Sequence, residues 1–460
     1  MGLRVKLEYK NGVLVATPDL HVGENLIENH IPGLTLKTPA GKVLLTMDKE
    51  EEYNLTIEQY SYLIYDCNNG IGKIKVRLEP ATLDYISVIS TKNISAMSGI
   101  PGADGLCIAC MDGTVYRYLP AITADPAAGA LVDNNNSVVS TKATFEPIYD
   151  MSTYIYLSNK CGLFDLVVAP DGRWFILVSM PLKMAVNAPK PDASYSHVNQ
   201  VYELTADGNF IAITELLYTS ECPGGKLLLH LPYLYVATSD DPKNPSAQRL
   251  DTLYGKILRF DVSLPGQSKA QSSNPFVAIY LNKDGRPSTN NEVTEVTGAP
   301  EIYAYGLHCP TGLSLDEATN KIFCTDMGEH NRESVKIIGK GGNYGWDDYE
   351  GSMAKSGNNL PFVAPIFEYA HEQAKNPLMC KIIGGYPIKI GTHNCYLFGD
   401  ISGRIHCIFD SKPDVYQQLW FSNISAYIHV FGRDSRGKIY VVLSDSPNRG
   451  QDYVYCITEY

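Results

Sequence analysis

Pro232-Tyr-Leu-Tyr-Val-Ala-Thr238 is a turn followed by a short strand-like run that ends on a small polar residue. The same pattern begins at five other positions, which are Asp104, Asp171, Asn320, Asn394 and Arg436. Six copies after residue 82 give about 63 residues per unit, enough for a four-stranded blade with long loops. One blade cannot bury both faces of its sheet, so neighbours must stack and the ring must close. We therefore predict a six-bladed β-propeller, since two stacked β-sandwiches would not need so regular a repeat.

The composition also favours an all-β fold. The 460 residues include 38 Gly, 27 Pro and 31 Tyr, and amphipathic helical patterns are almost absent. Short runs rich in Val, Ile, Tyr and Leu recur between turn residues instead.

The first part of the chain looks like a separate unit. The runs Leu3–Tyr9 and Val13–Thr17 flank Lys10-Asn11-Gly12, a sequence typical of a type I′ hairpin turn. Further strand-like runs follow, and Pro80 marks a boundary. We predict a small N-terminal β domain or arm over residues 1–82, serving assembly or attachment, and the propeller over residues 83–460.

Charge and hydropathy exclude two classes of partner. The chain has 38 basic and 50 acidic residues, a formal charge of −12, without the clustered Lys and Arg that phosphate recognition needs. Its longest apolar runs are too short to span a bilayer. We therefore expect no nucleic-acid partner and no membrane span. The N-terminus lacks the pattern of a signal peptide. If a signal peptide was removed, the protein is expected to be extracellular; otherwise it never used the secretory route, and association with a particle such as a virion is the alternative.

The eleven cysteines are scattered along the chain. Only Cys107 and Cys110 form a CxxC, and no second pair follows at zinc-site spacing. Positions i and i+3 of a strand point to opposite faces, so we interpret this pair as two packed core thiols. The odd count leaves at least one thiol free or paired with another chain.

The segment from residue 254 to residue 351 indicates a family. It contains Tyr254-Gly-Lys-Ile-Leu-Arg-Phe-Asp261, Pro300-Glu-Ile-Tyr-Ala-Tyr-Gly-Leu-His-Cys-Pro310 and Gly341-Gly-Asn-Tyr-Gly-Trp346. The order and spacing of these motifs resemble the glucose/sorbosone dehydrogenase family. That family includes soluble sugar dehydrogenases that use pyrroloquinoline quinone (PQQ) and the propeller of hedgehog-interacting protein. The resemblance is dense over residues 250–445, thin over 90–250 and absent from 1–82.

The resemblance shows where the catalytic base of a PQQ enzyme would lie in this sequence. A PQQ enzyme needs cations for the cofactor's carboxylates, a calcium ion to polarise the quinone, and a base to take the sugar's proton. In the family this base is the His of a His-x-Gly-Gly segment, and the matching stretch here is Cys222-Pro-Gly-Gly225. Cys222 thus stands at the base's position, and a thiol with an ordinary pKa near 8.5 is a poor base for an alcohol.

The positions that would hold PQQ have changed too. His308 and Cys309 replace the family's Arg-Asn pair, and Ile401 replaces a Lys. The remaining matches are Tyr427 and His429 in place of two Arg, and Lys160 in place of Gln or Glu. The resemblance therefore implies a degenerate pocket without a confident catalytic or cofactor-binding residue. His308 is expected either to line the pore or to bind an anionic ligand.

The loop from Asp326 to Val335 is about three residues shorter than the family's calcium-binding insertion. Its carboxylates could still hold one structural calcium, through Asp326, Glu329, Glu333 and the carbonyl of Tyr344. The alternative is that these carboxylates are solvated loop residues.

These observations lead to two functional hypotheses. The first is a non-catalytic propeller without a cofactor, which binds a protein or glycan partner or assembles with copies of itself. The alternative is a PQQ- and calcium-dependent aldose/sorbosone dehydrogenase with a diverged site. A hydrolase or lyase would need a catalytic constellation, and no Gly-x-Ser-x-Gly elbow occurs.

Overall fold

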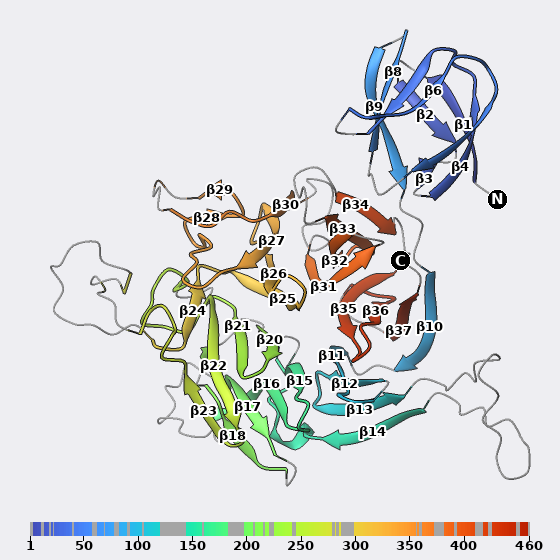
Figure 1. The fold of residues 1–460 in the computed structure, drawn as a ribbon. Coiled ribbons are helices and arrows are strands. Elements are labelled where there is room, and N and C mark those ends of the chain that lie inside the picture. Colours follow the sequence, from blue (N-terminus) through green and yellow to red (C-terminus); the bar gives the residue numbers. More distant parts are fainter. Residues whose placement is uncertain are drawn as a thin grey trace, which may run out of the picture.

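The computed structural model is all-β in the part of the chain that it describes (Figure 1). The described residues are 3–10, 13–17, 20–21, 23–38, 41–57, 62–68, 70–77, 82–89, 93–103, 105–119, 144–158, 161–182, 197–205, 208–214, 217–219, 225–241, 245–277, 281, 285–286, 299–355, 357, 361–371, 381–390, 393–409, 417–421, 426–447 and 451–458. Within them the one helix is a 3-10 turn, Ser152–Tyr154.

The first nine strands form two sheets with the orders β2-β1-β4-β7 and β3-β9-β8-β5-β6. They are β1 (Leu3–Lys10), β2 (Val13–Thr17), β3 (Leu20–His21), β4 (Gly23–Asn29), β5 (Leu34–Lys37), β6 (Val43–Met47), β7 (Glu52–Ile57), β8 (Tyr62–Cys67) and β9 (Gly70–Arg77). Pairing of Lys10 with Val13 confirms the predicted hairpin, whose two turn residues lie outside the described ones. Buried Val5, Ile27 and Leu63 belong to a core whose described members all come from residues 5–74.

The later strands form sheets arranged around a common axis (Figure 1). Their inner strands are β11 (Ile94–Gly99), β15 (Leu163–Val168), β20 (Gly225–His230), β25 (Cys309–Asp316), β31 (Ile382–Ile390) and β35 (Tyr427–Arg433). Each of these strands contacts the next in this order, and β35 contacts β11, which closes the ring. We call the end of the ring at which the inner strands begin the mouth.

The outer strands follow each inner strand in antiparallel order. They are β12 (Leu106–Cys110), β13 (Thr114–Leu119) and β14 (Thr144–Asp150); β16 (Trp174–Pro181), β17 (His197–Leu204), β18 (Phe210–Ala212) and β19 (Leu217–Thr219); β21 (Tyr233–Thr238), β22 (Lys256–Leu264), β23 (Gln267–Ala270) and β24 (Ile302–Tyr305); β26 (Lys321–Met327), β27 (Arg332–Ile338) and β30 (Phe367–Ala370); β32 (His393–Asp400), β33 (Arg404–Phe409) and β34 (Gln417–Phe421); β36 (Ile439–Ser444) and β37 (Asp452–Thr458). A small separate sheet pairs β28 (Tyr349–Glu350) with β29 (Met353–Ala354).

Each copy of the sequence repeat lies at the same place in this arrangement. The repeats lead into β12, β16, β21, β26, β32 and β36, and each of these strands pairs with an inner strand. The repeat therefore marks the second strand of a sheet, because that strand is buried on both faces and starts at a tight turn.

The last sheet is completed from both ends of the propeller sequence. Strand β10 (Thr82–Ile89) pairs with β37 along seven residue pairs, from Thr82 opposite Thr458 to Ile89 opposite Asp452. The ring is thus fastened by hydrogen bonds between an early strand and the final one.

Neighbouring sheets bury apolar side chains between them, and two glycines allow an unusually close approach. A Cβ on Gly312 of β25 would lie 2.3 Å from the Cα of Gly384 on β31. The two inner strands therefore touch backbone to backbone at this level of the ring.

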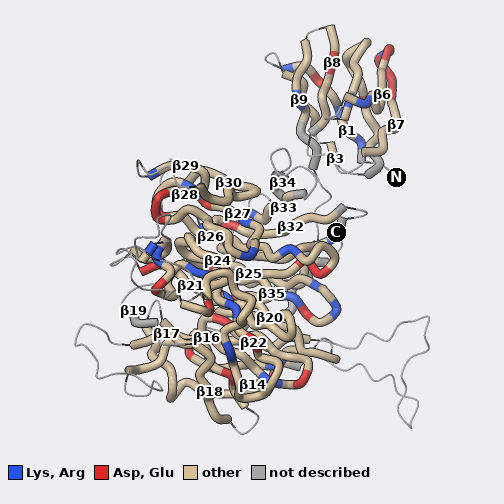
Figure 2. The backbone as a smooth tube through the Cα atoms, turned by 60° about the vertical axis from the view of Figure 1, so that its left-hand side comes forward, with Lys and Arg blue, Asp and Glu red and all other residues tan. Residues whose placement is uncertain are grey.

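The described residues can be compared with the expectations about partners and about cysteines. Lys and Arg are interspersed with Asp and Glu along the chain (Figure 2), and no helix among them is long and apolar enough to cross a membrane. Cys107 and Cys110 are buried in two different apolar clusters on opposite faces of β12, as predicted. The nine described cysteines form no disulfide with each other, while Cys222 and Cys380 lie outside the described residues.

Candidate functional site at the mouth of the ring

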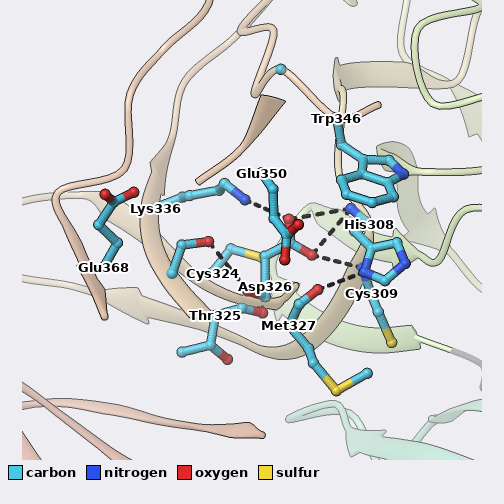
Figure 3. Close-up of polar contacts among 12 residues, drawn as sticks. His308, Cys309, Cys324, Thr325, Asp326, Met327, Lys336, Trp346, Glu350 and Glu368 are labelled. Carbon is cyan, nitrogen blue, oxygen red and sulfur yellow. Dashed lines mark hydrogen bonds and ion pairs between the residues drawn. The ribbon is translucent and has the colours of Figure 1, made fainter. Parts of the chain in front are cut away.

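His308 lies at the mouth, in the segment between β24 and β25 (Figure 3). Its Nδ1 is 2.7 Å from the carbonyl oxygen of Met327, so Nδ1 carries the proton and donates it. The ring centroid is 4.1 Å from that of Trp346. Gly306 starts this segment with φ +83°, and a Cβ there would lie 2.5 Å from Oδ1 of Asn343. The glycine therefore permits the turn that brings His308 against Trp346.

Asp326 holds the backbone of the segment that contains His308. One carboxylate oxygen accepts the N–H groups of Cys309 at 2.8 Å and His308 at 3.2 Å. The other oxygen is paired with the ammonium of Lys336, and both side chains are buried. Asp326 is thus consumed by an internal ion pair and two backbone hydrogen bonds, which together satisfy its buried charge.

Glu350 fills the centre of the adjacent loop (Figure 3). Its Oε1 accepts four successive backbone N–H groups, from Glu329 at 2.9 Å, His330 at 2.8 Å, Asn331 at 2.6 Å and Arg332 at 3.1 Å. Burial alone would raise the pKa of Glu350, but these donors outweigh burial and hold the pKa at about 2. Convergent N–H groups make a site for an anion, and the chain supplies that anion itself.

Each of the three carboxylates predicted as calcium ligands has another partner, Asp326 through Lys336 as described above. Glu329 pairs with Lys355 at 2.9 Å, and Glu333 is buried against His371 at 2.6 Å. The hydroxyl of Tyr344 donates to the carbonyl of Ile337, and its N–H to that of Tyr305. Among the described residues, no three His, Cys, Asp or Glu side chains form a group that could hold a metal ion. The loop is organised by a carboxylate and its N–H donors.

A second support for the mouth comes from Asp240. Its N–H donates to the carbonyl of His308 at 2.7 Å, and its Oδ2 accepts the indole N–H of Trp346 at 3.0 Å. Burial raises the pKa of Asp240. The fully buried Lys256 lies nearby, and its ammonium donates to the carbonyls of Ser246 and Ala247 at 3.0 Å each. Asp240 thus holds the backbone of His308 and the indole of Trp346, and Lys256 interacts electrostatically with Asp240.

The described positions that the resemblance assigns to PQQ do not fit a tricarboxylate. Ile401 is buried and carries no charge, and burial raises the pKa of the Cys309 thiol to about 12. His429 has its Nε2 at 3.2 Å from the carbonyl of Ser446, and Tyr427 is half-buried at the start of β35. Lys160 and Cys222 lie outside the described residues.

Several residues that organise the mouth were missed by sequence reasoning. Glu350, Lys336, Trp346, Asp240 and Lys256 make the contacts, yet sequence analysis assigned none of them to the site. Glu350 follows Asp347-Asp-Tyr, which looks like an ordinary acidic turn. The shortened loop is the sequence feature that could have indicated Glu350. A loop too short to bind calcium needs another charged group to hold its backbone in place.

We expect E350Q to lower the free energy of unfolding by about 2 kcal/mol at neutral pH, because an amide oxygen is a weaker acceptor than a carboxylate. A folded pKa near 2, against 4.5 for an ordinary Glu, means that this stability is present above pH 4.5. It is lost as pH falls towards 2, since the unfolded chain then binds the proton first.

Urea unfolding of both proteins at several pH values measures this difference, and Glu317, an exposed carboxylate, supplies the control E317Q. A gap between E350Q and wild type that stays constant from pH 7 to about pH 3 would contradict the assignment.

Comparison with known proteins identifies relatives over part of the chain. The family model "Glucose / Sorbosone dehydrogenase" matches residues 277–378. HIPL1 protein of Arabidopsis thaliana is 29% identical over 278 residues, and HIPL2 protein of the same plant is 35% identical over 205. Aldose sugar dehydrogenase YliI of Escherichia coli is 24% identical over 211 residues. These alignments cover 51%, 40% and 45% of this chain, but only 39%, 28% and 52% of the three relatives.

Solved structures extend the likeness to the whole ring. A glucose dehydrogenase superposes with a TM-score of 0.60 at 17% identity, covering 82% of this chain and 99% of its own. The PQQ-bound form of an aldose sugar dehydrogenase from Streptomyces coelicolor gives 0.55 at 16% identity, covering 82% and 98%. At this identity the likeness shows the fold, which is a propeller. The motifs, the family model and the fold agree: the chain matches the glucose/sorbosone dehydrogenase family over residues 277–378 and resembles its propellers in fold.

Proposed function

We propose that this chain is a non-catalytic, six-bladed propeller that acts as a binding or assembly protein. Residues 83–460 form the propeller, and the inner strands that follow one another around the ring support a count of six blades. Residues 1–82 form an N-terminal β module, supported by the separate core of β1–β9. In this reading β10, at the start of the propeller, completes the blade built by β35, β36 and β37.

The observation that carries the proposal is that the mouth satisfies its own charges. Asp326 is neutralised by Lys336, Glu350 takes the N–H groups of its loop, and Glu329 pairs with Lys355. A cofactor with three carboxylates needs unpaired cations, and a calcium ion needs unpaired oxygens. Charged groups that are already paired stabilise the ring, and they are not free to bind the carboxylates of PQQ or a calcium ion.

The partner we propose is a protein or glycan bound on the faces of the ring, or a second copy of the chain bound through the N-terminal module. A rigid ring loses little conformational entropy when its loops engage a partner. The similarity to the HIPL1 and HIPL2 proteins supports a binding role. The same proposal places the chain outside the cell or in an assembled particle.

The second candidate is a PQQ- and calcium-dependent aldose/sorbosone dehydrogenase with a diverged site. It is favoured by the similarity to an aldose sugar dehydrogenase of Escherichia coli and to the PQQ-bound neighbour. Under this candidate Cys222 or a residue near it would have to act as the base.

A titration with PQQ and calcium separates the two candidates. We expect no saturable PQQ binding at about 10 μM and no dye reduction with aldoses, because the carboxylates of PQQ would meet Ile401 and His308 in place of cations. The variant C222H, which restores the family's base, should remain inactive for the same reason.

An established aldose sugar dehydrogenase is the positive control for this titration. Tight PQQ binding with turnover by the wild-type chain would overturn the proposal. Turnover by C222H alone would show that only the base had been lost.

A further inference from the structure

A cavity of about 560 Å³ runs along the axis of the ring. It is lined by all the inner strands and by the segments that follow them, including Pro101, Leu231, Glu317 and Arg436. His308 precedes its inner strand and does not line the cavity. The cavity extends from the inner strands to the segments that follow them, and its volume is that of a small-molecule site.

Apolar groups form about half of the walls of this cavity. Met97, Leu229, Leu313 and Phe431 contribute to them from four different inner strands. Such walls favour a ligand with a hydrocarbon body, because burial of apolar surface contributes most of the binding free energy.

Two of the charged side chains in the cavity neutralise each other. Lys226 Nζ is 3.8 Å from Oδ1 of Asp165 and 3.3 Å from the carbonyl of Ser95. The other carboxylate oxygen of Asp165 accepts the N–H of Leu227 at 2.8 Å. This pair links β15 to β20. Its two charges cancel, so the pair itself adds no net charge to the cavity.

Arg433 lies at the end of β35 and, in the described part of the chain, is not part of such an ion pair. Its guanidinium is half-buried in the cavity wall and lies against Gly437. Within the described residues it has no hydrogen bond or ion pair to another side chain. The adjacent Asp434 is already engaged, since it accepts the N–H groups of Arg436 and Lys438 and the hydroxyl of Tyr440.

Tyr386 of β31 faces the same space. Burial raises the pKa of its phenol, Asp165 raises it further and Arg433 lowers it, so these charges act on the hydroxyl across the cavity. No hydrogen-bond partner for this hydroxyl is found in the described part of the chain. A guanidinium and a phenol thus line the same cavity together with apolar side chains.

We propose that this axial cavity binds a small monocarboxylate with an apolar body. The carboxylate of the ligand pairs with the guanidinium of Arg433 and accepts a hydrogen bond from the hydroxyl of Tyr386. The hydrocarbon part lies along Leu229, Leu313 and Phe431. Glu317 and Arg436 on the rim are exposed and offset each other's charge. This site goes beyond the proposed function, because neither Arg433 nor Tyr386 belongs to the residues that organise the mouth.

The test is calorimetric titration of the full chain with acetate, hexanoate and hexylamine. Hexanoate is expected to bind saturably with a dissociation constant of about 1 mM or below, acetate at least about tenfold more weakly, and hexylamine not at all. R433Q should weaken hexanoate binding by about tenfold or more, and Y386F by about threefold.

The matched control is K438Q, which removes an exposed cation of the same turn that does not line the cavity. It should keep the wild-type affinity, and thermal unfolding of each variant without ligand verifies folding. Y386F preserves the packing of the ring and keeps the test decisive even if R433Q does not fold. Absence of hexanoate binding at about 10 mM, equal binding of hexylamine, or wild-type affinity in Y386F would each overturn the proposal.

Discussion

Replacing Lys256 by methionine is expected to lower the free energy of unfolding by about 3 to 5 kcal/mol. The ammonium of Lys256 is the donor for the carbonyls of Ser246, Ala247 and Tyr254, and it is the countercharge of Asp240. Methionine has a similar length but supplies no donor, so three buried carbonyls and one carboxylate lose their partner.

The pH dependence gives a second readout of this residue. Burial lowers the pKa of Lys256 to about 7, while Asp240 and other nearby carboxylates raise it by a smaller amount. Between pH 7 and about pH 10 the unfolded chain therefore binds one proton more than the folded chain, and wild-type stability rises with pH through this group. K256M lacks that rise, so its deficit relative to wild type should grow over the same interval.

Denaturant unfolding at several pH values measures both effects. The control is K269M, which changes an exposed lysine on β23 of the same sheet and should cost less than about 0.5 kcal/mol. A deficit below about 1 kcal/mol for K256M would show that water replaces the ammonium as the donor to these carbonyls.

The second large effect is expected at the contact between two inner strands. Gly312→Ala should destabilise the ring by about 3 kcal/mol or prevent its closure, because the new Cβ would lie 2.3 Å from the Cα of Gly384 and 2.7 Å from Oγ1 of Thr325. The clash is with backbone, so no side-chain rotation can relieve it and β25 must move away from β31.

Gly339→Ala is the matched control for this substitution. Its Cβ would meet nothing within 4 Å, so a change within about 0.5 kcal/mol is expected. Thermal unfolding of the two alanine variants and wild type gives the comparison. Equal unfolding midpoints for G312A and G339A would mean that the inner strands are not in contact at this level.

The sequence was most informative where local pattern and burial coincide. The six turn-and-strand repeats fall on strands next to the inner strands, because such strands combine a tight turn with an unbroken apolar run. The Asn11-Gly12 signal predicted the pairing of β1 with β2 for a similarly local reason.

The mouth could not be predicted in the same way, since its contacts join residues far apart in the chain. Glu350 reaches a loop about twenty residues earlier, and Asp240 reaches Trp346 across 106 positions. Lys256 is the more difficult case, because lysine is rarely buried and only the surrounding carbonyls make its burial favourable. Resemblance located the right region and the carboxylate of Asp326, but the partners that complete its contacts, such as Lys336 and Glu350, were not among the matched positions.

The seam between β10 and β37 has a mechanical consequence. The N-terminal module is joined to the ring through β10, so a tensile load on that module is delivered first to the seven residue pairs of this seam. If the module anchors the chain to a larger body, the outermost strand acts as the tether. Detachment of that strand from β37 would lengthen the covalent link between anchor and ring, while β35, β36 and β37 remained paired with each other.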